Sequence, residues 1–298
     1  MSVAGAVTVA MLPAAWTSRS ALGSRPTSNS SDGKNSVARL PELRGLRSLG
    51  FQSKLLIMLI AVSVTSVLIA ALLGYFSGTN SLREAEFHRL VQLRESRDRE
   101  ITSYFDGVTN SAAVLTHSNA TITAMKDFTG AFAELQKTPL PPGAKESVDR
   151  YYSDVFEKRL EERSGETADA ALYRPTSNAQ TYLQALYTAP AKGNFDESAK
   201  ILNAGDPSNW TKLNATYQPF FADFAERFNF DDVMMIDTDS NIVYTTYKQA
   251  DFGANVNTGV YKSTRLAEGF RKSMLAASVD DVFLGDFENY APSYGVPT

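Results

Sequence analysis

Cysteine is absent from this chain of 298 residues, and histidine occurs only at His88 and His117. Without a thiol the protein forms no disulfide and no thiolate metal site, and two distant histidines do not suggest a metal-binding cluster. Common catalytic motifs are missing too, since the sequence contains no phosphate-binding glycine loop, no GxSxG and no HExxH. We therefore expect no metal, no cofactor and no catalytic residue in this chain.

An excess of basic residues is also lacking. Lysine and arginine number 29 against 33 aspartates and glutamates, for a net charge of -4. No basic stripe interleaved with aromatic residues appears in the later part of the chain, so nucleic acid is not an expected partner. The 17 phenylalanines and 13 tyrosines instead indicate a substantial hydrophobic core.

One long stretch has no charge and no proline. Leu55 to Phe76 reads LLIMLIAVSVTSVLIAALLGYF, and at about 1.5 Å per residue a helix of this length crosses a hydrocarbon core of roughly 30 Å. Its hydroxyl residues Ser63, Thr65 and Ser66 can donate to the helix's own carbonyls. We expect a transmembrane helix over residues 54–77, surrounded by membrane lipid.

Charge around this stretch predicts its orientation. Basic residues outnumber Asp32 and Glu42 just before it, at Lys34, Arg39, Arg44, Arg47 and Lys54. This bias places the N-terminus in the cytoplasm and the chain after Phe76 outside the plasma membrane. Residues 1–53 are interpreted as a disordered basic tail, because their middle is rich in serine, glycine, proline and asparagine.

Helical periodicity continues beyond the membrane segment over residues 78–229. A helix is predicted from Thr79 to about Asn119, either continuous with the span or capped at Asn80 or Ser81. Further helices are predicted up to Leu135 and over residues 148–160, 178–187 and 210–228, the last with an aromatic stripe. Lys137 to Gly143, KTPLPPG, separates the first two.

At Phe230 the pattern changes to that of strands. Val233–Asp237 and Ile242–Tyr247 are predicted to form a hairpin around the turn TDSN, followed by a helix over Ser263–Leu275 and a strand over Val282–Phe287. The expected fold class is α+β, with a partial antiparallel sheet in residues 230–298. Because this sheet has an open edge, we expect the chain to be the front part of a longer protein. The pairs Asp231-Asp232 and Asp280-Asp281 are interpreted as turn residues.

Two segments resemble known families. The hairpin D-x-D-x-x-I-V at Asp237–Val243 and the D-F-G-x-N at Asp251–Asn255 resemble the sensor domains of the Cache superfamily. Gly50 to Leu90 is similar to the first membrane segment of actinobacterial membrane-bound class III adenylate/guanylate cyclases. The resemblance implies a PAS-like sheet and a sensory input region. It places no catalysis in these residues, which include no second span, relay or cyclase segment.

A PAS-like sheet presents its concave face to a small molecule. The candidate ligand-binding residues are near the hairpin and the aromatic helix: Trp210, Tyr217, Asp237, Tyr244, Tyr247 and Lys248. An acid and a lysine flanked by tyrosines are suited to an amino acid or a small carboxylate. Strand alternation places Tyr244 and Tyr247 on opposite faces, so both cannot face one pocket.

Three functions remain open. The first is the extracytoplasmic sensor region of a receptor-type adenylate/guanylate cyclase. The second is the sensor of a methyl-accepting chemoreceptor or a sensor histidine kinase, and the third is a stand-alone anchored binding protein. A homodimer is expected, because small residues within the span permit close helix packing: Ala61, Ser66, Ala70, Ala71 and Gly74.

Overall fold

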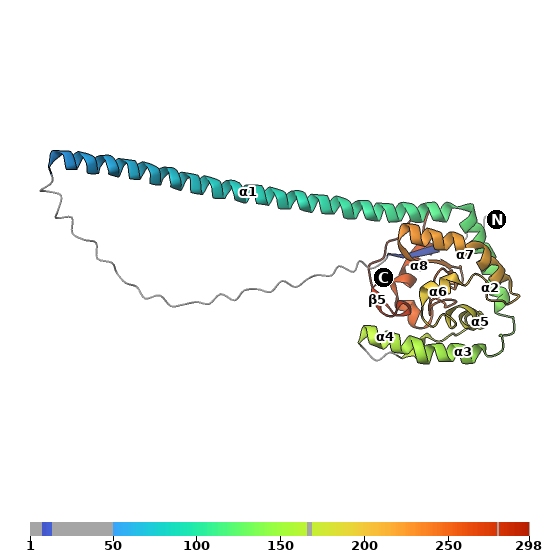
Figure 1. The fold of residues 1–298 in the computed structure, drawn as a ribbon. Coiled ribbons are helices and arrows are strands. Elements are labelled where there is room, and N and C mark those ends of the chain that lie inside the picture. Colours follow the sequence, from blue (N-terminus) through green and yellow to red (C-terminus); the bar gives the residue numbers. More distant parts are fainter. Residues whose placement is uncertain (1–7, 14–49, 166–168, 279, 298) are drawn as a thin grey trace. The chain divides into compact units, whose positions relative to one another are not determined.

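A computed structural model describes residues 8–13, 50–165, 169–278 and 280–297. These fall into two compact units, residues 18–103 and residues 1–17 with 104–298. The chain is predominantly helical, with the small antiparallel sheet expected of an α+β protein (Figure 1). The PAS-like character of that sheet stays a prediction.

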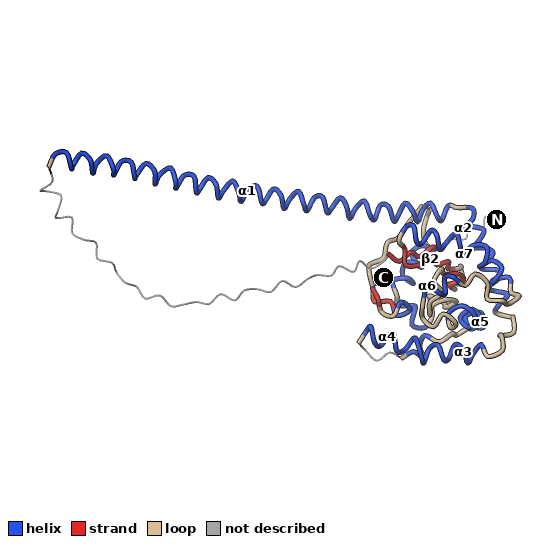
Figure 2. The backbone as a smooth tube through the Cα atoms, in the orientation of Figure 1, coloured by secondary structure: helices blue, strands red, loops and turns tan. Residues whose placement is uncertain are grey.

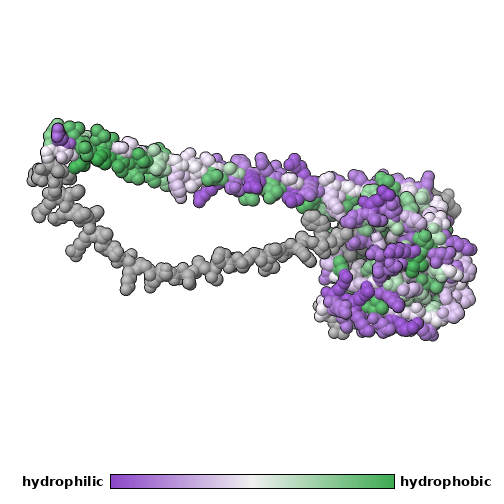
Figure 3. All heavy atoms as spheres, in the orientation of Figure 1, coloured by the Kyte–Doolittle hydropathy of each residue, from purple (hydrophilic) through white to green (hydrophobic). Residues whose placement is uncertain are grey.

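The unit of residues 18–103 contains most of the long helix α1, Phe51–His117. Of the two alternatives, the structure shows the continuous helix: α1 has no break or cap at Asn80 or Ser81. The Thr79 hydroxyl donates to the carbonyl of Tyr75 at 2.9 Å. Within the apolar stretch, Thr65 and Ser66 donate to the carbonyls one turn earlier. The apolar side chains are exposed along this part of α1, which in the described residues is the one helix long and apolar enough to cross a membrane (Figure 3).

The other unit begins in the last turns of α1. Ser118 is extended, and this ends α1 and starts α2 in a new direction. The helices that follow are α2 (Asn119–Leu135), α3 (Ala144–Tyr151), α4 (Glu157–Ser164), α5 (Asn178–Leu183), α6 (Phe195–Lys200), α7 (Asn209–Phe228) and α8 (Arg265–Met274). A π-helical turn, Tyr152–Phe156, joins α3 to α4. With the exception of α6, these helices confirm the predicted ones. Helix α6 begins within AKGNFDES, which the sequence predicts to be a loop, and the Asn194 side chain caps it. Hydroxyl side chains cap several others, such as Ser208 on α7 and Thr264 on α8.

The sheet has three antiparallel strands in the order β1-β2-β3: Thr8–Pro13, Phe230–Ile236 and Ile242–Thr245. The predicted hairpin is therefore confirmed as β2 and β3, and its turn is held by Asp237, whose carboxylate accepts the backbone N–H of Asn241 at 2.8 Å. Figure 2 shows the strands lying among the helices of this unit.

Both faces of β2 are buried. Val233 and Met235 pack in the main core with Phe128 of α2, Trp210 of α7, and Tyr187 of the π-helical turn Gln184–Thr188 that follows α5. Met234 and Ile236 point to the other face, where they pack with Ala267 and Phe270 of α8. Alternate side chains of β2 thus pack into two different cores, one on each face of the sheet. Because both faces are buried, the sequence of β2 is continuously apolar rather than alternating between apolar and polar residues.

Three sequence predictions are corrected. Val282–Phe287 is not a strand: Asp281 turns the chain by accepting the N–H groups of Ala277 and Ser278, and the segment finds no strand partner among the described residues. A short pair, β4 (Asn289–Tyr290) with β5 (Val296–Pro297), follows instead. The Asp231-Asp232 pair lies within β2 rather than in a turn, whereas Asp281 does hold a turn.

The third correction concerns the N-terminal tail. Thr8–Pro13, within the tail interpreted as disordered, is strand β1, with Val9 opposite Met235 and Leu12 opposite Asp232. Residues 1–7 and 14–49 of the tail lie outside the described residues. The pairing requires Thr8–Pro13 and β2 to be on the same side of any membrane, whereas a single crossing by Leu55–Phe76 would separate them.

A pair of engineered cysteines distinguishes these arrangements, and the cysteine-free background makes the result unambiguous. We expect Val9→Cys with Met235→Cys to form a disulfide in detergent micelles, since these residues are register partners. In membranes we expect no disulfide, because one crossing places the two cysteines on opposite sides. The bond is read by a mobility shift on non-reducing gels.

The matched control keeps the same cysteine on β2. In Leu12→Cys with Met235→Cys the two cysteines are not register partners, because Leu12 lies opposite Asp232, about 10 Å along β2 from Met235. This separation is too long for a disulfide, so the pair should not cross-link in either condition. Failure of the register pair in micelles would contradict strand β1. A disulfide in membranes would contradict the predicted topology.

Candidate functional site

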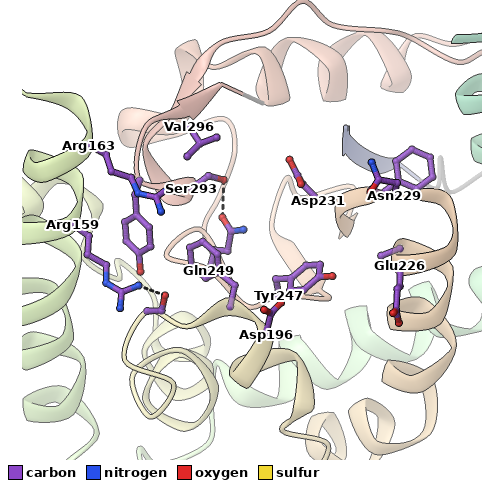
Figure 4. A pocket seen from close by; sticks show the side chains of 15 residues that line it. Arg159, Arg163, Asp196, Glu226, Asn229, Asp231, Tyr247, Gln249, Ser293 and Val296 are labelled. Carbon is purple, nitrogen blue, oxygen red and sulfur yellow. Dashed lines mark hydrogen bonds between the residues drawn. The ribbon is translucent and has the colours of Figure 1, made fainter. Parts of the chain in front are cut away.

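A cavity of about 460 Å³ opens in the unit that contains residues 104–298, a volume typical of small-molecule sites (Figure 4). Its walls come from α4, α6, the end of α7, the start of β2, the segment after β3 and the C-terminal residues around β5. The tertiary fold therefore assembles it from segments that are far apart in the sequence.

One side of the cavity is basic. Arg159 and Arg163 lie one turn apart on α4, and Figure 4 shows them on the same wall. Arg159 donates to the carbonyl of Gly193 at 2.5 Å, and its guanidinium carbon lies 5.5 Å from the centre of the Tyr294 ring. No carboxylate among the described residues forms an ion pair with either arginine. Burial raises the pKa of Tyr294, and the charges of both arginines act in the opposite direction.

Glycine is required where Arg159 docks. Gly193 has a φ of +75°, and a Cβ at this position would lie 2.5 Å from the Tyr294 hydroxyl and 2.9 Å from Nη1 of Arg159. Any larger residue would therefore displace both side chains and strain the backbone. The close approach fixes one end of the basic wall.

The opposite side is acidic. Asp196 of α6, Glu226 of α7 and Asp231 of β2 lie around Tyr247 (Figure 4). In the described part of the chain none of these carboxylates has a basic partner. The pKa of Tyr247 is raised first by burial and then by negative charge, to which these three carboxylates contribute alongside Asp232. The pKa of Asp231 is itself raised by burial.

Between the two walls lies Gln249, a buried side chain with an unused donor. Its Oε1 accepts from the Ser293 hydroxyl at 3.0 Å. Its Nε2 has no protein partner within the described ranges, and Figure 4 shows the amide at the cavity surface. A nearly fully buried amide that keeps a free N–H at a cavity indicates a bound acceptor or water.

The geometry does not suggest a metal. Over the residues that the structure describes, no group of three or more histidine, aspartate or glutamate side chains is arranged to hold an ion. The three carboxylates of the acidic wall come from different elements and surround a tyrosine instead. Recognition of charge on an organic ligand is the chemistry that the cavity offers.

Tyr247 is the sequence-predicted site residue that lines this cavity. Tyr244 and Lys248 are buried together elsewhere: Nζ of Lys248 donates to Oε1 of Gln218 at 2.7 Å, and the Tyr244 hydroxyl donates to the same oxygen at 2.7 Å. Burial lowers the pKa of Lys248 to about 7, with the charge of Asp232 opposing this. Lys248 therefore belongs to a closed polar network and does not reach the cavity wall.

The other three predicted residues have structural partners. Trp210 is fully buried, and its indole N–H donates to the carbonyl of Val243 at 2.9 Å. Tyr217 donates to the carboxylate of Asp127 at 3.1 Å, and Asp237 holds the hairpin turn. The structure brings Trp210 into contact with the rings of Tyr187 and Phe252 in the core, and Trp210 does not line the cavity.

Sequence reasoning missed most of the cavity, namely Arg159, Arg163, Asp196, Gln249, Ser293 and Tyr294. The arginines fall in the charged run EKRLEERS, whose pattern is that of an ordinary solvated helix face. Ser293 ends the short 3-10 turn Ala291–Ser293 near the C-terminus, and Tyr294 follows it in a left-handed conformation. No spacing rule connects these segments, so only the fold could reveal them.

Comparisons of the chain with family models, curated proteins and solved structures find no match. The shape and the charges of the cavity are therefore the basis for inferring a function.

Two buried carboxylates hold the segments that carry cavity-lining residues through hydrogen bonds. Asp232 lies under the segment that leads to Tyr247: its Oδ1 accepts the N–H groups of Val233 at 2.7 Å and Thr246 at 2.8 Å, and its Oδ2 accepts from the Thr245 hydroxyl. Oδ2 of Asp251 accepts from the Tyr290 hydroxyl at 2.7 Å, and Oδ1 of Asp251 has no partner in the described part of the chain. Burial raises the pKa of Asp232 to about 7 and that of Asp251 to about 6.

Asp251 makes stability depend on pH. Between pH 3.8 and about 6 the folded protein holds a proton on Asp251 that the unfolded chain has released, so the free energy of unfolding falls as pH rises through this window. Asp251→Asn carries no such proton. We expect the fall between pH 4 and 7 to be smaller in this variant, by about 3 kcal/mol as an order of magnitude.

The measurement is denaturant unfolding of the full chain in micelles, followed by Trp210 fluorescence in a Trp16→Phe background. Asp239→Asn, which removes an exposed carboxylate in the hairpin turn, serves as the matched control and should keep the original pH dependence. Equal pH dependence in Asp251→Asn and the parent protein would refute the assignment.

Proposed function

We propose that this chain is the membrane-anchored, extracytoplasmic sensor region of a signal-transduction protein. The observation that carries the proposal is a cavity with unpaired charged walls in a unit that begins within the same helix as an apolar, membrane-length segment. The cavity binds a small molecule, an amino acid or a small carboxylate, and α1 carries the resulting displacement to the membrane.

The cavity is well placed for such coupling. Ala225 of α7, which lines the cavity, packs in the same core as the hairpin residue Val243 and as Leu115 from the last turn of α1. Tyr294 of the opposite wall packs in a second core. A ligand that prefers one arrangement of these walls shifts the population of that arrangement. A long helix without a break, as α1 is from Phe51 to His117, transmits a small shift over its length without dissipating it in a loop.

The output most consistent with the chain is a receptor-type adenylate/guanylate cyclase, on the resemblance of Gly50 to Leu90. A chemoreceptor or sensor kinase is the second candidate, because these share the same kind of input region. The reading frame that follows codon 298 distinguishes them: a cyclase requires paired metal-binding aspartates, and a chemoreceptor requires a long heptad hairpin.

In the proposed orientation the basic residues before Leu55 stay in the cytoplasm and the cavity faces outward. This orientation and the β1–β2 pairing exclude each other within one inserted molecule. In a molecule inserted in this orientation, the edge of β2 that pairs with β1 would be unpaired, and an open apolar edge is prone to pairing with other chains.

A homodimer places two copies of α1 side by side in the membrane. Ser66, Ala70 and Gly74 recur every four residues, which places small side chains along one face of the span. We expect Ala70→Cys to form several-fold more disulfide-linked dimer in membranes than Leu72→Cys, which lies about 200° around the helix. Equal cross-linking at both positions would argue against this face.

Ligand binding is tested by blocking the cavity. In the parent protein we expect at least one compound from a panel of amino acids, carboxylates and amines to raise the melting temperature, as binding to the folded state must. Val296→Trp fills the cavity from its C-terminal wall and should abolish that rise.

Val114→Trp is the matched control, since it makes the same substitution at an exposed position of α1 outside the cavity. It should preserve the rise in melting temperature. A rise that persists in Val296→Trp would place binding elsewhere, and the absence of any rise across the panel in the parent protein would contradict the proposed function.

A further inference from the structure

One wall of the cavity is positively charged and the other is negatively charged, and among the described residues neither set of charges has an oppositely charged partner. The basic wall holds Arg159 and Arg163, and the acidic wall holds Asp196, Glu226 and Asp231. Within the described ranges none of the five forms an ion pair, although ion pairs are common on the same surface, for example Arg227 with Asp223 and Lys200 with Glu197. The charges that face the cavity are kept apart from one another.

This separation of the two walls restricts which charged groups a ligand can carry at each of its ends. A dicarboxylate would satisfy the arginines and be repelled by the three carboxylates. A diamine would satisfy the carboxylates and be repelled by the arginines. Four of these five side chains are exposed and Asp231 is half-buried, so solvent weakens each single repulsion. Discrimination therefore comes from the two or three like charges of one wall acting together. A molecule with one charge of each sign at opposite ends satisfies both walls.

The side chains between the walls match an extended ligand. Gln249 offers the free N–H of its amide at the middle of the cavity, and the Tyr247 ring lies among the carboxylates. On the basic side the Tyr294 hydroxyl lies next to Arg159. An anionic end at the arginines, an acceptor near Gln249 and a cationic end beside Tyr247 form a single line through the site (Figure 4).

We propose that the cavity recognises a small dipolar molecule with a carboxylate at one end and an ammonium or guanidinium at the other, the class of the linear ω-amino and ω-guanidino acids. The carboxylate binds at Arg159 and Arg163, and the cation binds at Asp196, Glu226 and Asp231. This inference rests on the proposed function, because it specifies the ligand of that same cavity.

Four linear probes test both ends. 6-Aminohexanoate has a carboxylate at one end and an ammonium at the other, hexanoate lacks the ammonium, and pentylamine lacks the carboxylate. Adipate is the dicarboxylate. By titration calorimetry on the full chain in micelles, we expect 6-aminohexanoate to bind at least tenfold more tightly than each of the other three, since each of them leaves one wall without its partner.

Two variants assign the ends. Arg163→Gln should weaken 6-aminohexanoate about tenfold and leave pentylamine unchanged or improved, because the lost charge faces the carboxylate. Asp231→Asn should weaken 6-aminohexanoate by a similar factor and leave hexanoate unchanged or improved, because the lost charge faces the cation. Arg150→Gln and Asp239→Asn make the same substitutions at exposed positions outside the cavity and should bind all four probes as the parent does.

The outcomes separate the two proposals. If adipate or pentylamine binds as tightly as 6-aminohexanoate, or if both variants weaken all probes equally, the dipolar ligand is refuted. If compounds of another charge class produce a rise in melting temperature that Val296→Trp abolishes, the sensor function stands and this inference fails. If no compound gives a cavity-dependent rise, both fail.

Discussion

The carboxylate of Asp232 is the interaction on which the site depends. It lies at the start of β2 and accepts N–H groups from β2 and from the chain just after β3, so it closes the hairpin from within. Several hydrogen bonds to one buried acceptor compensate its removal from water, and losing them would leave a buried group unsatisfied. Because the hydrogen bonds of Asp232 hold Thr245 and Thr246 in place, they also position the next three residues, Tyr247, Lys248 and Gln249.

The side chains of these three consecutive residues lie in three different surroundings. Tyr247 turns to the acidic wall of the cavity, Lys248 turns back into the network of Gln218 and Tyr244, and Gln249 reaches the middle of the cavity. Lys248 takes a left-handed conformation, with a φ of +47°, which allows consecutive side chains to diverge in this way. A short irregular segment thus links the hydrophobic core to the polar cavity.

The cavity is closed by the chain's own C-terminal residues. Tyr294 stacks on Phe195 with ring centres 5.1 Å apart and contacts Arg159, while Tyr290 donates to Asp251. Tyr294 also packs in a hydrophobic core with Phe156 and Leu160, so this wall is continuous with the packed interior of the unit. A ligand that moves the wall would therefore also act on the core behind it.

The sequence by itself determined the elements whose pattern is local. The apolar run from Leu55, the aromatic stripe of α7 and the hairpin at Asp237 were all predicted, because hydrophobic periodicity and turn residues act over a few neighbouring positions. It also excluded disulfides through the absence of cysteine. The strand over Val282–Phe287 was predicted wrongly, because a strand forms only where a partner edge exists.

Only the tertiary structure decided which polar residues meet. Arg159, Asp231, Gln249 and Tyr294 belong to four segments whose local patterns give no sign of one another, and Trp210 and Lys248, which looked like ligand-binding residues, are satisfied by partners in the core. Strand β1 is a further example, since its pairing with β2 joins residues more than two hundred positions apart. The physical reason is that a site's charge pattern arises from long-range contacts, which burial of the core fixes and local periodicity does not encode.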